Sequence, residues 1–265
     1  MANNKTNILF IGCGNMGSAI LKAIQDNNNF KIFVIDRNFK NSSSQTTTVK
    51  TIKDFNEKID ILILGMKPQS LNNIDPAIKP KISLETLIVS LLAGTNTNEI
   101  EEIFGSDKKV VRLMPNIAAL KQTSTSSCFF NGNNNEKDKN LALSIFENFG
   151  ICEILSDEAD MHISTIINGG AIAYFALIIK YMKKAALKNS ESLTSEQLNN
   201  LIYNTYQNLL DLNIDEDEII KLICSKKGTT ETVINSLKQQ NIEAIIENAI
   251  DAGVSRSIEL SKGNN

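Results

Sequence analysis

Residues 7–20 read NILFIGCGNMGSAI, and this stretch decides the fold. The apolar run Ile8–Ile11 predicts a buried parallel strand, and the residues after the loop have the apolar spacing of a helix. Between them stand Gly12, Gly14 and Gly17, at the spacing of a loop that binds a dinucleotide pyrophosphate. The first glycine permits a tight turn, the second leaves room for the phosphates, and the third lets the helix pack closely on the strand. The alternative is a glycine-rich turn without a ligand.

The first turn of this helix extends the predicted site. Asn15 and Met16 would present unpaired backbone N–H groups at the positive end of the helix dipole. A diphosphate group is stabilised in that position. The strand before the loop and the helix after it supply the context that this glycine spacing needs, so we expect a dinucleotide here.

The bulk composition is that of an ordinary globular protein. Of 265 residues, 42% are hydrophobic and 22% charged, which allows one large domain or two smaller ones. The net charge of −3 gives no reason to expect nucleic acid or an anionic membrane as a partner. Four scattered cysteines and a single histidine predict no metal site. With neither a signal peptide nor an apolar run approaching about eighteen residues, we expect a cytoplasmic protein.

Further apolar runs alternate with helix-length segments, which predicts an α/β fold with a doubly wound parallel sheet of the Rossmann type. The predicted strands after the first are Lys31–Ile35, Ile59–Leu64, Thr86–Leu91 and Lys109–Met114, with two more at Ser126–Phe130 and Ile151–Leu155. A helix is expected near Asp138–Asn148, between the last two strands. The polar segment Asn38–Thr48 lacks an apolar period and is predicted to be a loop with a short helical turn.

Two charged residues end the second predicted strand and give opposite indications about the cofactor. Asp36 lies about twenty residues beyond the glycine loop, where a carboxylate binds the adenosine ribose hydroxyls of NADH. Arg37 is placed to pair with the 2′-phosphate of NADPH or to stack on adenine. The sequence therefore predicts NADPH or NADH without deciding between them.

Three later strand ends carry small or constrained residues. Ligands of doubly wound sheets gather at the carboxyl ends of the strands, so we expect these residues to contact the cofactor. They are Met66, Lys67 and Pro68 after one strand, Ala93 and Gly94 after the next, and Asn116 after the third. The alternative is that the prolines nearby simply stop the strands.

From residue 157 onward helical periodicity dominates. We therefore predict a dinucleotide-binding domain over 1–156 and an all-helical domain over 157–265. One helix, Met161–Leu187, is apolar nearly all round, which suits burial against another subunit as well as against its own chain. Four more helices are expected at Leu193–Leu212, Asp215–Ile223, Thr229–Leu237 and Ile242–Leu260.

Taken in order, these motifs resemble the pyrroline-5-carboxylate reductase family nearly end to end. The matching segments are GCGNMGSAI at 12–20, MKPQ at 66–69, SLLAG at 90–94, VRLMPN at 111–116, GGAIAY at 169–174, SKKGTT at 225–230, and the tail with Ala249, Ala252, Arg256, Ser257 and Leu260. The sequence departs from the family at Lys226-Lys227, where Pro-Gly is usual, and at Gly170-Ala-Ile172, where Ser-Gly-Pro is usual.

The resemblance implies an NAD(P)H-dependent enzyme that reduces 1-pyrroline-5-carboxylate to L-proline, the last step of proline biosynthesis. It implies that Ser225, Gly228, Thr229 and Thr230 bind the substrate, with Thr230 hydrogen-bonded to the ring nitrogen in the catalytic role. From the residues alone, Ser225 or Thr229 would equally serve as the cap of the following helix. The family forms interlocked homodimers and larger rings of dimers, with helical dimerisation domains.

Two rival functions follow from the departures. The altered loops would permit reduction of another cyclic imine. They would also suit a degenerate homologue that binds a dinucleotide without catalysing a reaction.

Overall fold

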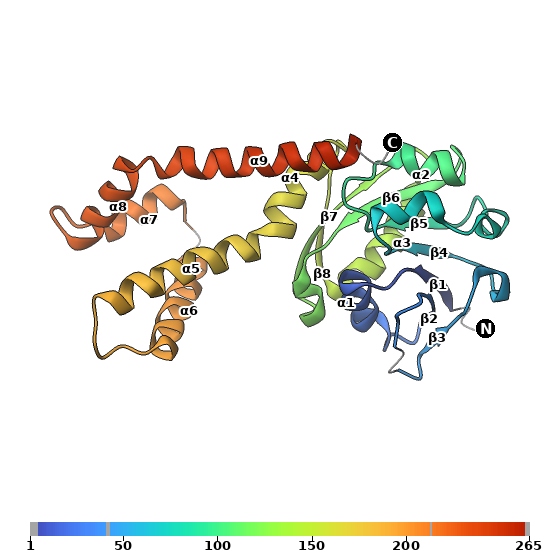
Figure 1. Cartoon of the computed structure of the whole chain (residues 1–265), viewed down its shortest axis with the longest axis horizontal. Coiled ribbons are helices and arrows are strands. Elements are labelled where there is room, and N and C mark those ends of the chain that lie inside the picture. The colour runs from blue at the N-terminus through green and yellow to red at the C-terminus, as the bar shows by residue number, and fades with distance from the viewer. Residues whose placement is uncertain (1–4, 41–42, 213, 263–265) are drawn as a thin grey trace. The chain divides into compact units, whose positions relative to one another are not determined.

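A computed structural model describes residues 5–40, 43–212 and 214–262 of the chain. Within these residues an eight-stranded sheet has the order β3-β2-β1-β4-β5-β6-β7-β8 (Figure 1). Strand order reverses at β1, as in doubly wound folds, so the carboxyl ends of β1 and β4 border a crevice. The predicted fold class is confirmed.

Most strands begin and end within two residues of the predicted runs. They are β1 (Thr6–Ile11), β2 (Phe30–Ile35), β3 (Thr46–Thr48), β4 (Ile61–Leu64), β5 (Leu87–Ser90), β6 (Lys109–Met114), β7 (Ser124–Phe130) and β8 (Gly150–Ile154). The helices that accompany them are α1 (Asn15–Ile24), α2 (Thr97–Phe104) and α3 (Glu136–Phe146).

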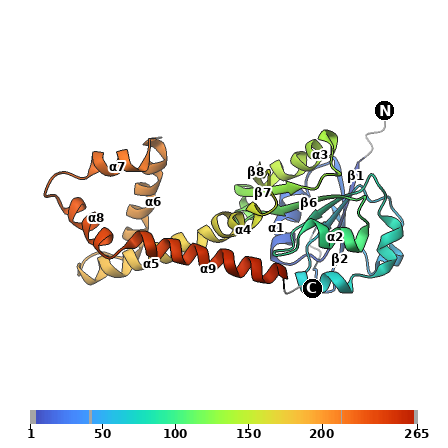
Figure 2. The same ribbon diagram turned by 90° about the horizontal axis from the view of Figure 1, so that it is seen from above.

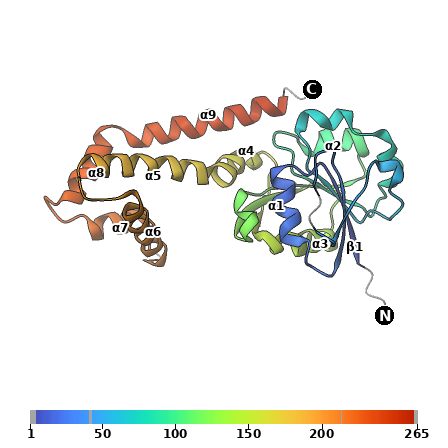
Figure 3. The ribbon, with the colours of Figure 1, turned by 60° about the horizontal axis from the view of Figure 1, so that its bottom comes forward.

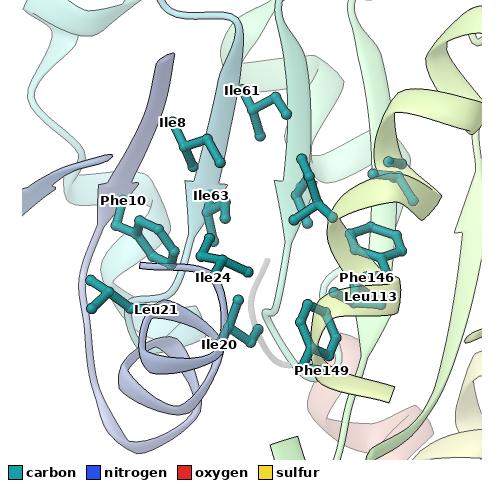
Figure 4. Close-up of a cluster of buried hydrophobic side chains, with 14 of the residues drawn as sticks. Ile8, Phe10, Ile20, Leu21, Ile24, Ile61, Ile63, Leu113, Phe146 and Phe149 are labelled. Atoms are coloured by element: carbon teal, nitrogen blue, oxygen red, sulfur yellow. The ribbon is translucent and has the colours of Figure 1, made fainter. Parts of the chain in front are cut away.

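The core has two layers because the central strands are buried on both faces. In β1, Ile8 and Phe10 belong to one buried cluster and Leu9 to the other, as the alternation of strand side chains requires. The first cluster packs α1 and α3 on the sheet, through residues such as Ile20 and Phe146 (Figures 3 and 4). The second cluster includes Ile100 and Phe104 of α2, which covers the opposite face (Figure 3).

Two parts of the sheet differ from the sequence-based prediction. The strand β7 runs antiparallel to β6, whereas the other pairs are parallel. The predicted loop 38–48 contains the short strand β3, which pairs with β2 through Ile32–Val34; residues 41 and 42 lie outside the described ranges. Three threonines carry too little pattern to indicate a strand, but their β-branched side chains suit one once β2 provides backbone partners.

Between β4 and β5 the predicted helix-length segment is two short 3₁₀ helices, Pro68–Asn73 and Pro76–Lys81. Each begins with a proline, whose missing N–H costs nothing at a helix start. Pro80 then prevents the second from extending as an α-helix, because a proline inside a helix removes a backbone hydrogen bond.

By backbone contacts the chain forms two compact units, one of residues 1–170 together with 253–265 and one of residues 171–252. The second unit is helical in its described residues (Figure 2). Its helices are α5 (Gly170–Lys188), α6 (Ser195–Leu212), α7 (Glu216–Ile223), α8 (Thr229–Gln239) and the first part of α9 (Ile242–Lys262). The predicted boundary between a domain over 1–156 and a domain over 157–265 stays a prediction.

The predicted long apolar helix is interrupted rather than uniform. It consists of α4 (Asp160–Ser164), a π-helical turn at Thr165–Gly169, and α5. Within the described residues this 29-residue stretch is long and apolar enough to cross a membrane by length and composition, where none was expected from the sequence. Only 6% of its most apolar window is buried in the single chain.

Candidate functional site

The glycine loop joins β1 to α1 and has a different constraint at each glycine. Gly12 has a φ of +78°, and a Cβ there would come within 2.5 Å of the Met66 backbone nitrogen. Gly14 has open space instead, since the nearest atom to a Cβ would be the Gly65 oxygen at 4.0 Å. A Cβ on Gly17 would stand 3.4 Å from the Gly12 oxygen, so α1 packs tightly on the loop. The loop is therefore closely packed at Gly12 and Gly17 and open at Gly14.

The N-terminus of α1 is free to bind an anion. Gly14 is its N-cap residue, and no side chain caps it. The N–H groups of a first helical turn lack partners inside the helix, so they attract phosphate. Burial raises the pKa of the neighbouring Cys13 thiol, which keeps that side chain neutral beside an anion.

A cavity of about 880 Å³ opens over this loop at the carboxyl ends of β1, β2, β4 and β5. Most of the predicted cofactor residues line it. They are Gly12, Gly14, Asn15, Met16, Asp36, Arg37, Met66, Lys67, Pro68 and Ala93. The volume and the donor set fit a dinucleotide, whose pyrophosphate would lie at the open surface of Gly14.

Three predicted cofactor residues do not line this cavity, and each has a structural role. Gly17 packs against the loop from below. Gly94 has a φ of +74° and faces α9, where a Cβ would come within 3.2 Å of Leu260. Asn116 is buried, and its Oδ1 accepts from the Ala118 N–H. The surface of Gly94 is thus covered by α9 and does not face the large cavity.

Asp36 binds backbone groups on both sides of it. Its Oδ2 accepts from the Cys13 N–H at 2.7 Å, and its Oδ1 accepts from the Asn38 N–H at 2.7 Å. Arg37 is exposed beside it. The carboxylate therefore fixes the glycine loop to the turn after β2, a role that only the folded structure could show.

Sequence reasoning missed several residues that line the cavity. They are Asn38, Lys50, Thr51, Ser70, Asn73 and Asp75. Lys50 and Thr51 follow β3, so the missed strand also concealed its strand end. The three threonines at 46–48 are too short a run to reveal that strand from the sequence alone.

A largely buried polar cluster around Arg112 of β6 was not predicted. Arg112, 5% exposed at its side chain, donates to Glu158 at 3.0 Å. Glu158 also accepts from the N–H and hydroxyl of Thr97 at the start of α2, at 2.7 and 2.8 Å. His162 in α4 lies 2.9 Å from the Ser257 hydroxyl, and burial and the Arg112 charge lower the pKa of this imidazole. An arginine inside the apolar run KVVRLM was the available signal.

The predicted substrate loop lies in the helical unit, directly before α8. Gly228 is the N-cap, and no side chain caps the helix, so the capping roles considered for Ser225 and Thr229 are wrong. The Gly228 N–H donates to the Ser225 oxygen, and Lys227 has a φ of 59°. The turn is tight because a Cβ on Gly228 would overlap the Ser225 hydroxyl. Thr229 and Thr230 form the first turn of α8.

The sheet, the glycine loop and the cavity define a dinucleotide-binding protein with an added helical unit. Comparison with known proteins identifies the family within this class. A family model described as pyrroline-5-carboxylate reductase dimerisation matches residues 158–260. Another, described as NADP oxidoreductase, coenzyme F420-dependent, matches residues 7–94.

Full-length relatives agree with the first match. The chain is 30% identical to pyrroline-5-carboxylate reductase of Staphylococcus haemolyticus over 96% of its own length and 98% of the relative. It superposes on Plasmodium falciparum pyrroline carboxylate reductase, solved with NADP bound, with a TM-score of 0.87 and 28% identity, covering 97% and 99% of the two chains. The Coxiella burnetii reductase gives a TM-score of 0.82 at 26% identity, with the same coverage of the two chains. The chain belongs to the pyrroline-5-carboxylate reductase family.

Proposed function

We propose that this protein is an NAD(P)H-dependent reductase that converts 1-pyrroline-5-carboxylate to L-proline, the last step of proline biosynthesis. The observation that carries this proposal is the large cavity over the glycine loop, in a chain that matches a reductase along nearly its whole length. The enzyme class is that of oxidoreductases acting on a C=N group.

The cavity supports the cofactor part of the proposal. The open surface at Gly14 and the uncapped start of α1 would hold the pyrophosphate, and Asn15 and Met16 would supply N–H donors. Met66, Lys67, Pro68 and Ala93 would border the cofactor beyond it. The reduced dinucleotide supplies the hydride, and the protein must hold the imine carbon close and exclude water.

The loop before α8 supports the substrate part. Its uncapped helix start offers backbone N–H groups to a carboxylate, and Ser225, Gly228 and Thr229 form the turn around it. The hydroxyl of Thr230 would hydrogen-bond the ring nitrogen and so orient the imine for hydride transfer. Lys226 and Lys227 add positive charge in place of the usual Pro-Gly, which favours an anionic substrate.

We also propose that the protein works as a homodimer or as a larger ring of dimers in the cytoplasm. The dimerisation match covers the helical unit, where α5 exposes Phe175, Leu177, Ile178 and Tyr181. A second copy that covers these side chains would remove from solvent the apolar surface of the stretch that is also long and apolar enough to cross a membrane. The net charge of −3 favours neither nucleic acid nor an anionic membrane as a partner.

The altered residues Gly170-Ala-Ile172 and Lys226-Lys227 favour one alternative, a reductase of a different cyclic imine. A degenerate dinucleotide-binding homologue is the other. The deciding experiment is oxidation of NADPH and NADH by the purified protein with pyrroline-5-carboxylate, beside a six-membered carboxylated imine and an uncarboxylated one. We expect the highest kcat/KM with pyrroline-5-carboxylate. Greater activity on another imine, or dinucleotide binding without turnover, would contradict the proposal.

A further inference from the structure

The loop before α8 contains a turn whose backbone conformation is unusual for its sequence. Residues 225–228 form a β-turn, because the Gly228 N–H donates to the Ser225 carbonyl oxygen at 2.9 Å. The third residue of this turn is Lys227, and its φ is 59°. Lys226, the second residue, is not among the described residues with a positive φ. The turn therefore has the pattern of type II, which normally takes glycine at its third position.

A left-handed lysine at this position needs support from elsewhere in the structure. Apart from glycines, the described residues with a positive φ are Gln122, Lys227 and Asn241. Gln122 and Asn241 lie at helix ends, where a left-handed residue is common. Lys227 instead precedes the helix α8, and its side chain carries a steric penalty in this conformation that glycine lacks.

The support comes from the side chain of Glu231. Its Oε2 accepts a hydrogen bond from the Lys227 N–H at 2.6 Å. Glu231 lies in the first turn of α8, where the helix dipole favours a negative charge. Within the described part of the chain this carboxylate forms no ion pair. It therefore acts on the turn and not on a neighbouring cation.

The bond selects between two orientations of the peptide that joins Lys226 to Lys227. Type I and type II turns differ by a rotation of this central peptide through roughly half a circle. In the observed orientation its N–H points to Glu231. In the other orientation Lys227 has a negative φ, and the Lys226 carbonyl oxygen takes the place of that N–H. A carbonyl oxygen there repels a carboxylate and competes with it for the first-turn N–H groups of Thr229 and Thr230.

We propose that Glu231 is a positioning residue for substrate binding, because its carboxylate holds this peptide with the N–H toward α8 and so keeps the start of the helix open to the carboxylate of the imine. This inference rests on the proposed function and adds to it a residue that acts through the turn. Substrate affinity then depends on how much of the protein has the left-handed turn. The effect of Glu231 should fall on KM and not on kcat, since the turn is already formed in the substrate complex.

The test is a double-mutant cycle on the full chain, with KM and kcat for pyrroline-5-carboxylate measured at a saturating concentration of reduced dinucleotide. Glu231→Ala removes the acceptor. We expect KM to rise about tenfold, as the left-handed turn falls to about a tenth of the population, while kcat changes less than about twofold. Glu231→Gln keeps an acceptor oxygen and should hold KM within about threefold of the parent value.

Lys227→Gly supplies the decisive background, because glycine adopts the left-handed conformation without a steric penalty. In this background Glu231→Ala should raise KM by less than about threefold. The matched control is Lys226→Gly, which removes the neighbouring lysine but not the left-handed one. There the rise should stay about tenfold. An equal effect of Glu231→Ala in all three backgrounds, an equal relief in both glycine backgrounds, or no effect in the parent would overturn the proposal.

A measurement without turnover separates this inference from the proposed function. Hydrogen exchange of the Lys227 amide, followed by NMR on protein with isotope-labelled lysine, should quicken in Glu231→Ala and keep the parent rate in Glu231→Gln. Unchanged exchange in Glu231→Ala would overturn the inference. If the parent reduced no imine and the exchange still quickened as expected, the proposed function would fail and the action of Glu231 on the turn would stand.

Discussion

Gly12 and Gly14 are two residues apart, yet they need to be glycine for different reasons. Gly12 has a left-handed φ and no room beside the Met66 backbone, so its constraint belongs to the protein itself. Gly14 has an ordinary φ of −68° and open space above it. A side chain at position 14 would therefore strain neither the backbone nor its neighbours, and it would fill only the space proposed for the pyrophosphate.

Gly14→Val therefore separates cofactor binding from folding. We expect NADPH affinity to fall by about ten- to a hundredfold, from the steric cost of a misplaced side chain of about 1–3 kcal/mol. The melting temperature of the variant should equal that of the parent protein. Gly132→Val is the control, because a Cβ at that turn meets nothing within 4 Å. Unchanged NADPH affinity in Gly14→Val would move the pyrophosphate elsewhere.

Thr230 tests the substrate loop at the same scale. Thr230→Ala removes the hydroxyl proposed to bind the ring nitrogen, so kcat should fall about tenfold or more while the KM for cofactor stays constant. Thr230→Ser keeps the hydroxyl and should retain most of the activity. If the alanine variant were as active as the parent, the hydroxyl would have no role in hydride transfer.

Single residues also mark the limit of sequence reasoning. The glycine spacing and the strand ends Met66–Pro68 predicted most of the large cavity, because these signals are local. The partners of Asp36 were beyond prediction, since they are backbone groups set by the distance between two turns. Gly94 was predicted to contact the cofactor, but in the structure it faces Leu260, which is more than 160 residues away in the sequence.

At the scale of elements, the sequence predicted the helices and strands that are long enough to show an apolar periodicity. The long helices and the alternating strands carry many apolar positions, so α6, α8 and α9 were found near their observed bounds. The three-residue strand β3 and the reversed direction of β7 were not, because both depend on pairing with a neighbour. The missed strand explains why Lys50 and Thr51 were missed in the cavity.

Glu158 links three elements and should therefore influence stability strongly. It binds the first turn of α2, where negative charge is favourable, and it pairs with the buried Arg112. Glu158→Gln leaves that guanidinium without a counter-charge, and we expect a loss of about 1–3 kcal/mol in the free energy of unfolding, measured by urea titration.

The matched control for Glu158→Gln is Glu259→Gln, whose ion pair with Arg256 is exposed at 65% and 66% of the two side chains. Exposed pairs contribute little, so this change should be nearly silent. Comparable losses in both variants would show that burial of Arg112 does not determine the cost.

The whole molecule has an apolar surface that one chain leaves uncovered. On α5, Phe175, Ile178 and Tyr181 are exposed at 55%, 53% and 57%. Introducing carboxylates with Phe175→Glu and Ile178→Glu should shift the protein from dimer to monomer in sedimentation velocity, because burying an unpaired charge is costly. Leu84→Glu, at an equally exposed leucine of the nucleotide unit, should leave the oligomer intact. A variant that stays dimeric would exclude this face of α5 from the interface.

The compact unit that carries the cavity is discontinuous, since the chain leaves it at Gly170 and returns at Gly253. Its last segment contributes Ser257 to His162 and Leu260 to Gly94. A ribosome translates Ser257 and Leu260 only after the whole helical unit. The unit that carries the cavity therefore cannot complete its own packing until the segment beyond Gly253 has been translated, although its strands are made before the helical unit.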